Sequence, residues 1–231
     1  MARAVAENVS GPFFVNERCI DCGTCWTFDP EHYGAGAKTA FVHRQPSGAE
    51  AQRQALLALQ ACPVAAIETS AELLQQTPAD GFPALITTAG DAEIFYCGWA
   101  SRKSFGARSW LLKRQAGNVL IDVPRWSAPL ARRIQSMGGV SAMVLTHRDD
   151  VADHQRWTQA LGCPRWIHQA DGDAAPEAEH QLNGWDAETI APGLQLIPTP
   201  GHTAGSLCAV LGESRCVLFS GDHLWWNADQ K

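Results

Sequence analysis

The fold of the first part of this chain is decided by the stretch Cys19-Ile20-Asp21-Cys22-Gly23-Thr24-Cys25. Its three cysteines stand three residues apart, and Cys62-Pro63 supplies a fourth further along the chain. Three thiolates at this spacing wrap a short loop around one face of a cuboidal cluster, and a remote thiolate closes the cage. Soft thiolate ligands suit iron–sulfur clusters. The spacing therefore predicts one cluster, held by Cys19, Cys22, Cys25 and Cys62.

Two alternatives stay open for these cysteines: a zinc site, or thiols that are merely buried. Zinc ligands normally come as separated pairs, whereas here two Cys-x-x-Cys steps share Cys22. The short bacterial cluster-binding run has a further cysteine followed by proline, and that cysteine serves a second cluster. Asp29-Pro30 stands near that position here, which favours a single cluster. We expect the remaining cysteines to be small buried hydrophobic residues: Cys97, Cys163, Cys208 and Cys216.

The residues around the cluster cysteines indicate a small α+β domain. We expect a helix over residues 49–61, ended by Pro63, and short strands over 13–15, 39–43 and 67–69. Residues 11–69 resemble a single-cluster 4Fe-4S ferredoxin domain. The resemblance implies a 4Fe-4S cluster rather than a 3Fe-4S cluster, because Cys22 occupies a position that 3Fe-4S forms often lack.

Composition restricts the classes of protein to which the chain can belong. Its 231 residues are 45% hydrophobic and 18% charged, which excludes a mostly disordered chain. The net charge of −6 argues against nucleic acid as the main partner, because phosphate binding needs clustered cations. No apolar stretch approaches the ~20 residues of a membrane span, and no signal peptide is visible. We therefore expect a cytoplasmic protein without a membrane partner, in which clustered cysteines bind metal rather than form disulfides.

A Pro/Gly-rich connection within the chain predicts two domains. We expect an iron–sulfur domain over residues 1–70, a linker over 71–83 that ends in a Pro/Gly-rich connection, and a second domain over 84–231. In the second domain, strands alternate with helices, which is typical of α/β layers. The predicted strands cover 93–97, 109–113, 119–123, 142–147, 165–168, 194–198, 207–211 and 216–219, and the predicted helices cover 129–137 and 153–161.

Three segments of the second domain place histidines and carboxylates after apolar strands. They are Thr146-His147-Arg148-Asp149-Asp150-Val151-Ala152-Asp153-His154, Gly201-His202-Thr203-Ala204-Gly205-Ser206 and Gly221-Asp222-His223. In α/β folds, ligands converge where strands end. Nitrogen and oxygen ligands of this kind suit Zn²⁺, Fe or Mn²⁺. The segments therefore predict a second metal site, separate from the cysteines.

These segments resemble the motifs of the metallo-β-lactamase superfamily, namely His-x-His-x-Asp-His, Gly-His-Thr-x-Gly-Ser and Gly-Asp. The resemblance covers residues from about 84 onwards and implies an αββα fold. It also implies that His147 matches the first histidine, that His202 is a ligand of the first metal, and that Asp222 is a carboxylate bridging two metals.

The first motif departs from the superfamily pattern. Asp149 takes the place of the second histidine, as a carboxylate does in the related flavodiiron proteins. The Asp-His pair comes two residues late, so that Asp153 and His154 are the predicted ligands of the second metal. The insertion leaves a choice between Asp149 and Asp150, of which we favour Asp149.

The superfamily also has a last histidine some tens of residues beyond the bridging carboxylate. The sequence ends at Lys231, so we expect a domain truncated at its C-terminus. The alternative is that His223 replaces the missing ligand. Adjacent residues of a strand point to opposite faces, which makes it difficult for Asp222 and His223 to share one metal.

The resemblance implies a metal-dependent hydrolase with one or two divalent ions, zinc or iron. Asp153 would orient the metal-bound hydroxide and act as the general base. The Gly-His-Thr-x-Gly-Ser turn is most similar to thioester hydrolases of the glyoxalase II type, which favours a small-molecule ester or thioester substrate. Two alternatives follow from the fused cluster domain: a redox enzyme whose di-iron site receives electrons from the cluster and an electron-transfer partner, or a non-enzymatic redox sensor.

Overall fold

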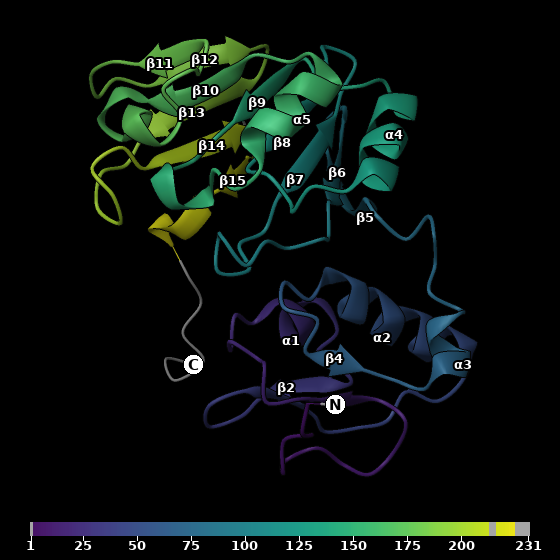
Figure 1. The fold of residues 1–231 in the computed structure, drawn as a ribbon. Helices are drawn as coiled ribbons and strands as arrows, with labels where there is room; N and C mark the ends of the chain where they lie inside the picture. Colours follow the sequence, from purple (N-terminus) through teal and green to yellow (C-terminus); the bar gives the residue numbers. More distant parts are fainter. Residues whose placement is uncertain (1, 213–215, 225–231) are drawn as a thin grey trace. The chain divides into compact units, whose positions relative to one another are not determined.

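The computed structural model describes residues 2–212 and 216–224 and divides into two compact units (Figure 1). The first unit contains the chain up to Phe82 together with Gly98–Ala107. The second contains Pro83–Cys97 and the chain from Arg108 onwards. The end of the chain, on which the truncation prediction rests, lies outside the described residues.

Short strands and one long helix build the first unit. The helix α2 (Ala49–Ala61) has the predicted bounds, and its alanines and leucines bury one face. It ends at Cys62 because Pro63 cannot continue a helix. The other elements are β1 (Phe14–Val15), α1 (Thr24–Phe28), β2 (Tyr33–Ala35), β3 (Ala40–Val42), β4 (Ile67–Glu68) and α3 (Ala71–Leu74).

Two antiparallel pairs close this unit around a small core. Strand β1 pairs with β4, and β2 pairs with β3. Phe13, Tyr33, Leu56 and Ile67 are buried together, so β1, β2, α2 and β4 or the residues beside them contribute to one core. The predicted strands agree with β1, β3 and β4 within two residues, whereas the sequence pattern did not predict β2 or α1.

The division into units differs from the sequence expectation at two places. Residues 71–83 were expected to form a linker, but Phe82 is buried and its ring packs 5.7 Å from the ring of Phe28. Residues 98–107 were expected within the second domain, but they group with the first unit. An apolar ring is stabilised by leaving water, which explains why the chain around Phe82 packs rather than forming an exposed connection.

The second unit contains two β-sheets. The seven-stranded sheet has the order β11-β10-β9-β8-β7-β6-β5, and the four-stranded sheet has the order β12-β13-β14-β15. Pairs from β8 to β11 are parallel and all other pairs are antiparallel. The strands are β5 (Ala84–Ala89), β6 (Ala92–Tyr96), β7 (Trp110–Lys113), β8 (Val119–Ile121), β9 (Ala142–Val144), β10 (Arg165–His168), β11 (His180–Leu182), β12 (Glu188–Ala191), β13 (Leu194–Pro198), β14 (Leu207–Leu211) and β15 (Val217–Phe219).

The two sheets of this unit share one apolar core. Leu112 and Ile121 of the larger sheet are buried in the same cluster as Leu196, Leu207 and Phe219 of the smaller sheet. Successive side chains of a strand alternate between faces, so their neighbours on the larger sheet face the opposite side. That side is covered by α4 (Ala128–Ser136) and α5 (His154–Leu161), as Figure 1 shows.

The layers are therefore helix, sheet and sheet. The resemblance predicted an αββα fold, with a helical layer on each side. Within the part of the chain that the structure describes, the α-helices of this unit are α4 and α5, and both belong to the same layer. Short 3-10 turns complete the unit: η1 (Arg148–Asp150), η2 (Gln169–Ala174) and η3 (Gly221–His223). Among the described residues, the helices are too short or too polar to cross a membrane.

Candidate iron–sulfur and metal sites

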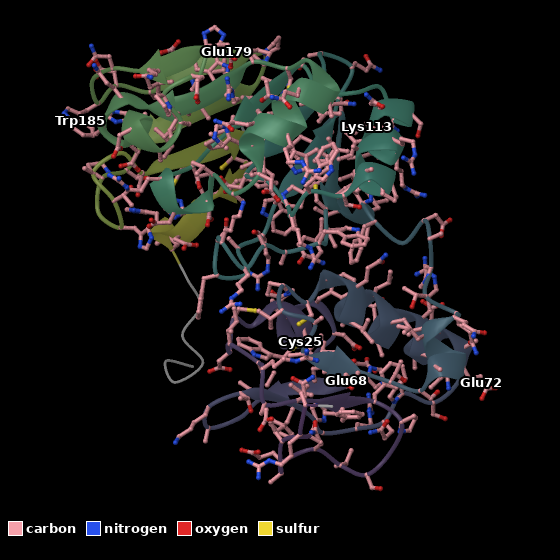
Figure 2. The ribbon with its side chains drawn as sticks, viewed as in Figure 1. Cys25, Glu68, Glu72, Lys113, Glu179 and Trp185 are labelled. Atoms are coloured by element: carbon pink, nitrogen blue, oxygen red, sulfur yellow. The ribbon has the colours of Figure 1, made fainter. Side chains whose placement is uncertain are left out.

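The four predicted cluster cysteines line one apolar cavity in the first unit. Val15, Ala40 and Val64 are among its other lining residues. Burial raises the pKa of Cys25, and negative charge on the other three cysteines raises it further. Burial likewise raises the pKa of Cys22. Figure 2 labels Cys25 in the interior of this unit.

Backbone N–H groups are directed at two of the sulfur atoms. The N–H of Asp21 donates to Cys19 Sγ at 3.4 Å, and the N–H of Ala66 donates to Cys62 Sγ at 3.3 Å. Hydrogen bonds of this kind stabilise the negative charge that a cluster places on its thiolates. An apolar cavity with four converging thiols and N–H donors fits an iron–sulfur cluster, whose positive iron ions replace the mutual repulsion of the thiolates with attraction.

Asp29, which stands near the position of a further cysteine in two-cluster proteins, has another partner. Its carboxylate oxygens lie 2.8 and 3.0 Å from His32 Nδ1, and both side chains are buried. Burial raises the pKa of Asp29, and the hydrogen bond with His32 opposes that rise. The Asp29 carboxylate is therefore engaged by His32 in the core of the unit, which agrees with a site for one cluster.

The second site lies where three segments of the second unit meet. His147 follows β9, and Asp149 and Asp150 lie on η1. His202 lies in the loop between β13 and β14, and Asp222 lies on η3 after β15. Side-chain ligand atoms form two groups in which all atoms lie within 4.8 Å of one another: His147 with Asp149 and His202, and His147 with Asp150 and Asp222.

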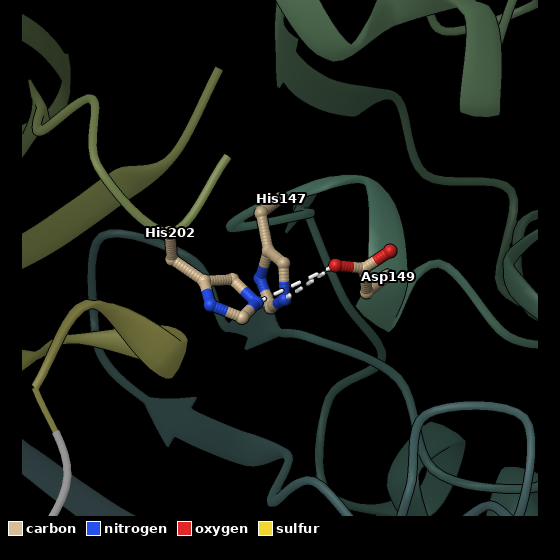
Figure 3. Close-up of side chains that lie close together, drawn as sticks. All are labelled: His147, Asp149 and His202. Atoms are coloured by element: carbon tan, nitrogen blue, oxygen red, sulfur yellow. Dashed lines mark ion pairs between the residues drawn. The ribbon is translucent and has the colours of Figure 1, made fainter. Parts of the chain in front are cut away.

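The rings of His147 and His202 lie in edge-on contact, and both are close to the carboxylates of Asp149 and Asp222. Their ring centroids are 4.8 Å apart, with the ring planes nearly perpendicular at 82°. Asp149 Oδ2 lies 3.4 Å from His202 Nε2 and 3.9 Å from His147 Nε2, as the dashed lines in Figure 3 mark. Asp222 Oδ2 lies 3.7 Å from His147 Nε2 and 3.8 Å from His202 Nε2. Each of the two carboxylate oxygens therefore lies within 4 Å of both Nε2 atoms.

A hydrogen-bond chain orients the His147 ring. Thr146 Oγ1 donates to Asp122 Oδ2 at 2.9 Å and therefore accepts from His147 Nδ1–H at 3.0 Å. This arrangement leaves the lone pair of His147 on Nε2. His147 is 1% exposed, and Nε2 has no hydrogen-bond partner within the described residues. A buried nitrogen without a partner costs free energy, and a bound cation would remove that cost.

The electrostatics of the second site also favour a cation. Burial raises the pKa of Asp150 to about 9, with the negative charges of Asp122, Asp222 and Asp149 adding to the effect. Burial also raises the pKa of Asp122 to about 7, and hydrogen bonds from Thr146 oppose that rise. Burial lowers the pKa of His147, which keeps its ring neutral. Crowded carboxylates beside a neutral imidazole are a donor set that fits a divalent metal ion.

Two residues outside the ligand groups hold the loops in place. Asp171 on η2 is fully buried and accepts from the N–H of Arg148 at 3.0 Å, from Thr203 Oγ1 at 2.5 Å and from the N–H of Gly205 at 3.1 Å. Gly221 has φ +50°, and a Cβ there would lie 2.5 Å from Thr146 Oγ1. Only glycine therefore allows η3 to approach Thr146 and bring Asp222 to the site.

Residues 15–69 match the family model of the 4Fe-4S single cluster domain of Ferredoxin I. The first part of the chain is therefore a ferredoxin-type iron–sulfur domain.

Among curated proteins, the chain is 27% identical over 135 residues to a Bacillus subtilis (strain 168) protein described as uncharacterized protein YmaE. The match covers 55% of this chain, which spans about half (48%) of the length of that relative.

Among solved structures, the chain is similar to metallo-β-lactamases. SMB-1 in a complex with mercaptoacetic acid is 17% identical, with coverage of 63% of this chain and 66% of that chain and a TM-score of 0.45. The Cronobacter sakazakii enzyme with a HARLDQ motif is 16% identical, with coverage of 55% and 58% and a TM-score of 0.44. The β-lactamase from Chitinophaga pinensis is 14% identical, with coverage of 58% and 59% and a TM-score of 0.43.

The structure brings some of the predicted ligands together and leaves others apart. His147 belongs to both ligand groups, with Asp149 and His202 in one and with Asp150 and Asp222 in the other. The sequence analysis had favoured Asp149 over Asp150. His223 is exposed and belongs to neither group of described ligands. The bonds of Asp122 to Thr146 and of Asp171 to Arg148 and Thr203 were not predicted, because each aspartate is distant in sequence from the residues it supports.

Asp153 and His154 lie outside both ligand groups. Asp153 Oδ2 accepts from the N–H of Trp126 at 2.9 Å. His154 is buried at the start of α5, and its Nδ1 lies 3.2 Å from a guanidinium nitrogen of Arg165. Burial and the positive charge of Arg165 lower the pKa of His154. A neutral ring that accepts at Nδ1 carries its proton on Nε2, so this arrangement leaves no lone pair for a metal. Their roles as base and as ligand stay predictions.

Proposed function

We propose that the chain is a metal-dependent hydrolase of the metallo-β-lactamase type, acting on a small-molecule ester or thioester, with a fused 4Fe-4S ferredoxin-type domain. The observation that carries the proposal is the buried, unpartnered Nε2 of His147, faced by Asp149, Asp222 and His202. The agreement of this geometry with the three sequence motifs supports the same conclusion.

The ligands differ in exposure in a way that suits a hydrolase. The side chain of His147 is 1% exposed, whereas those of Asp149 and Asp222 are 61% and 50% exposed. One side of the site is thus anchored in the protein and the other is open to substrate and water. When bound, a divalent ion lowers the pKa of a water molecule and polarises a carbonyl oxygen.

The residues of the chain prepare the site for that chemistry. Asp122 and Thr146 hold His147 in the tautomer that offers Nε2. Asp149 and Asp222 supply negative charge that offsets the charge of the cation. Asp171 keeps the loops that bear Asp149 and His202 in register through its bonds to Arg148 and Thr203. Asp153 is the proposed general base. In that role its carboxylate would accept a proton from water in place of the hydrogen bond that it now accepts from the Trp126 N–H.

Metal content and hydrolysis together test this proposal. We expect purified protein to hold zinc in addition to the iron of the cluster, and to hydrolyse aryl esters or thioesters. His202→Ala and Asp222→Ala should lower metal occupancy and reduce kcat/KM by roughly a hundredfold, since a metal ion contributes several kcal/mol to such reactions. Asp186→Ala is the matched control, because Asp186 is also an exposed carboxylate of the second unit. Full metal and activity in Asp222→Ala would contradict the assignment.

A second function is favoured by the balance of ligands. The two groups contain three carboxylates, Asp149, Asp150 and Asp222, and two histidines. Hard oxygen ligands suit iron, and a cluster in the same chain could deliver electrons to it. We therefore propose a redox enzyme with a di-iron site as the alternative. Iron well beyond four atoms per chain, with little zinc, would favour the redox function, and the reverse would favour hydrolysis.

A further inference from the structure

The connection between β6 and β7 is part of the first unit, although both strands belong to the second. The strands pair in register up to Tyr96 and Trp110, and the N–H of Cys97 donates to the carbonyl of Ser109 at 3.0 Å. Between them the chain runs through Gly98–Ala107, which groups with the first unit. Hairpin connections usually have 2–5 residues, so a segment of this length needs a reason.

The segment Gly98–Ala107 is folded upon itself. The N–H of Gly106 donates to the carbonyl of Ser101 at 2.8 Å, and the N–H of Ala107 donates to the carbonyl of Ser104 at 2.8 Å. Ala100, Ser101 and Ser104 are buried. These bonds give the segment one shape, which allows it to form a fixed part of a site.

One contact of this segment lies beside Cys62. The N–H of Ala100 donates to the carbonyl of Ala61 at 3.1 Å. Ala61 is the last residue of α2, and the carbonyl groups of the last helical turn have no partner within the helix. Ala100 therefore caps the helix at the residue immediately before the fourth cluster cysteine.

A second contact lies beside Cys22. Thr24 Oγ1 is 3.2 Å from Cys22 Sγ and donates to the carbonyl of Gly106 at 3.2 Å. Gly106 has φ +89°, and a Cβ at this position would lie 2.7 Å from Cys22 Sγ. The absence of a side chain thus lets the backbone of the segment pack directly against a cluster cysteine.

The Thr24 hydroxyl connects the two sides of this contact. A hydroxyl carries one proton and can accept two hydrogen bonds. While Cys22 is a thiol, its proton can go to Thr24 Oγ1 as Thr24 donates to Gly106. Once Cys22 is a thiolate ligand it can only accept, so the single Thr24 proton is shared between the sulfur and the Gly106 carbonyl, both of which lie 3.2 Å from Thr24 Oγ1. Hydrogen bonds to cluster sulfurs stabilise the reduced form and raise the reduction potential.

We propose that Gly98–Ala107 is a working part of the iron–sulfur site, fixed by Thr24 and Gly106 so that it covers Cys22, tunes the potential of the cluster and limits the access of oxygen. The inference rests on the assignment of a cluster to the first unit and is independent of the reaction at the second site. It gives the β6–β7 connection a function that neither sheet of the second unit requires.

The test compares Thr24→Val with Thr24→Ser in anaerobically purified protein. The valine variant loses the donor and should show a lower midpoint potential, whereas serine keeps the hydroxyl and should match the wild type. Loss of one hydrogen bond should make bleaching of the cluster in air about fivefold faster. Limited trypsin digestion at the exposed Arg102 and Lys103 should accelerate by about the same factor in the valine variant, which needs no redox measurement.

A glycine pair gives an independent control. Gly106→Ala should speed bleaching because its Cβ meets Cys22. Gly48→Ala has the same kind of backbone strain, at φ +85°, but its Cβ meets nothing within 4 Å, so it should not speed bleaching. Wild-type potentials, bleaching and digestion in Thr24→Val and Gly106→Ala would overturn the proposal, as would equal changes in Thr24→Val and Thr24→Ser. If Gly106→Ala fails to load iron, the Thr24 pair decides. Wild-type protein without about four irons per chain would overturn the cluster assignment itself.

Discussion

Cys62 is the predicted cluster ligand furthest along the chain from the others. It lines the apolar cavity with Cys19, Cys22 and Cys25, and the Ala66 N–H donates to its sulfur. Cys62→Ser should lose most of the cluster, because a hard hydroxyl replaces a soft thiolate. Iron content and visible absorbance after anaerobic purification measure the loss.

Cys216 is the control for that experiment. It is exposed and is not among the residues that line the cavity. Cys216→Ser should keep full iron and absorbance. Equal behaviour of the two variants, whether both lose the cluster or both keep it, would contradict the ligand assignment.

Asp150 destabilises the metal-free protein as the pH rises. Its pKa is about 9 in the folded state, above the ordinary value of an aspartate, chiefly because it is buried. The folded state therefore binds more protons than the unfolded state between about pH 4 and pH 9, and stability falls as the pH rises through that window. Asp150→Asn removes this cost, so the metal-free variant should be more stable than wild type at pH 8, with the difference vanishing toward pH 4.

Urea unfolding of metal-free protein, followed by tryptophan fluorescence at several pH values, measures this effect. Added Zn²⁺ should reverse the order of stability at pH 8, because the wild type keeps a carboxylate that the cation binds. A variant less stable than wild type at pH 8 without metal would show that Asp150 is ionised and paired in the folded state.

At the scale of elements, the 3-10 turn η2 holds two metal-site loops through one side chain. Asp171 accepts from Arg148 on η1 and from Thr203 and Gly205 in the His202 loop. Asp171→Asn replaces an acceptor with an N–H₂ group that faces donors, so both loops should shift. We expect metal affinity to fall about 10- to 100-fold, as is usual when the partner of a ligand-bearing segment is lost.

Asp173 lies on the same turn and provides the matched control. Its carboxylate is 65% exposed and pairs with the Arg148 guanidinium at 2.7 Å. An exposed pair of this kind contributes little, so Asp173→Asn should bind metal as wild type does. Titration with a chromophoric chelator gives both affinities. Equal affinities for the two variants would remove Asp171 from the support of the site.

At the scale of the whole molecule, the chain should carry two metal centres that are lost separately. Two of the predicted ligands of the second unit are accessible, since the side chains of His202 and Asp222 are 38% and 50% exposed. The cluster cysteines line an apolar cavity, and thiolates hold iron more tightly than carboxylates do. A chelator at neutral pH should therefore remove the metal of the second unit while the cluster absorbance remains.

Metal analysis before and after dialysis, together with the absorbance spectrum, follows the two centres. Exposure to air should have the opposite effect, bleaching the cluster while the divalent ion stays bound. Loss of both centres in one constant proportion under either treatment would contradict two independent sites.

Local patterns in the sequence sufficed wherever a few residues, close along the chain, carry the whole signal. The Cys19–Cys25 spacing predicts the cluster because three ligands within one loop need little from the rest of the fold. The match to the family model over residues 15–69 confirms that domain. The helix over 49–61 was predicted to the residue, since its composition and Pro63 define both its body and its end. His147, His202 and Asp222 were predicted because they lie in short motifs near the ends of apolar strands and match motifs of the metallo-β-lactamase superfamily.

Only the tertiary structure decided which side chains meet and which segments support them. Asp153 and His154 follow the motif in sequence, but the turn η1 places Asp150 beside His147, and the start of α5 directs His154 toward Arg165. Asp171 touches loops more than twenty residues away on either side, so no local pattern reports its role. The sequence of Gly98–Ala107 gives no sign of a special role, and only the structure shows its contacts with Thr24 and Ala61. The types of ligand residue and the ends of strands can be predicted from neighbouring residues in the sequence. Which ligand residues meet at one site depends on packing between residues far apart in the chain.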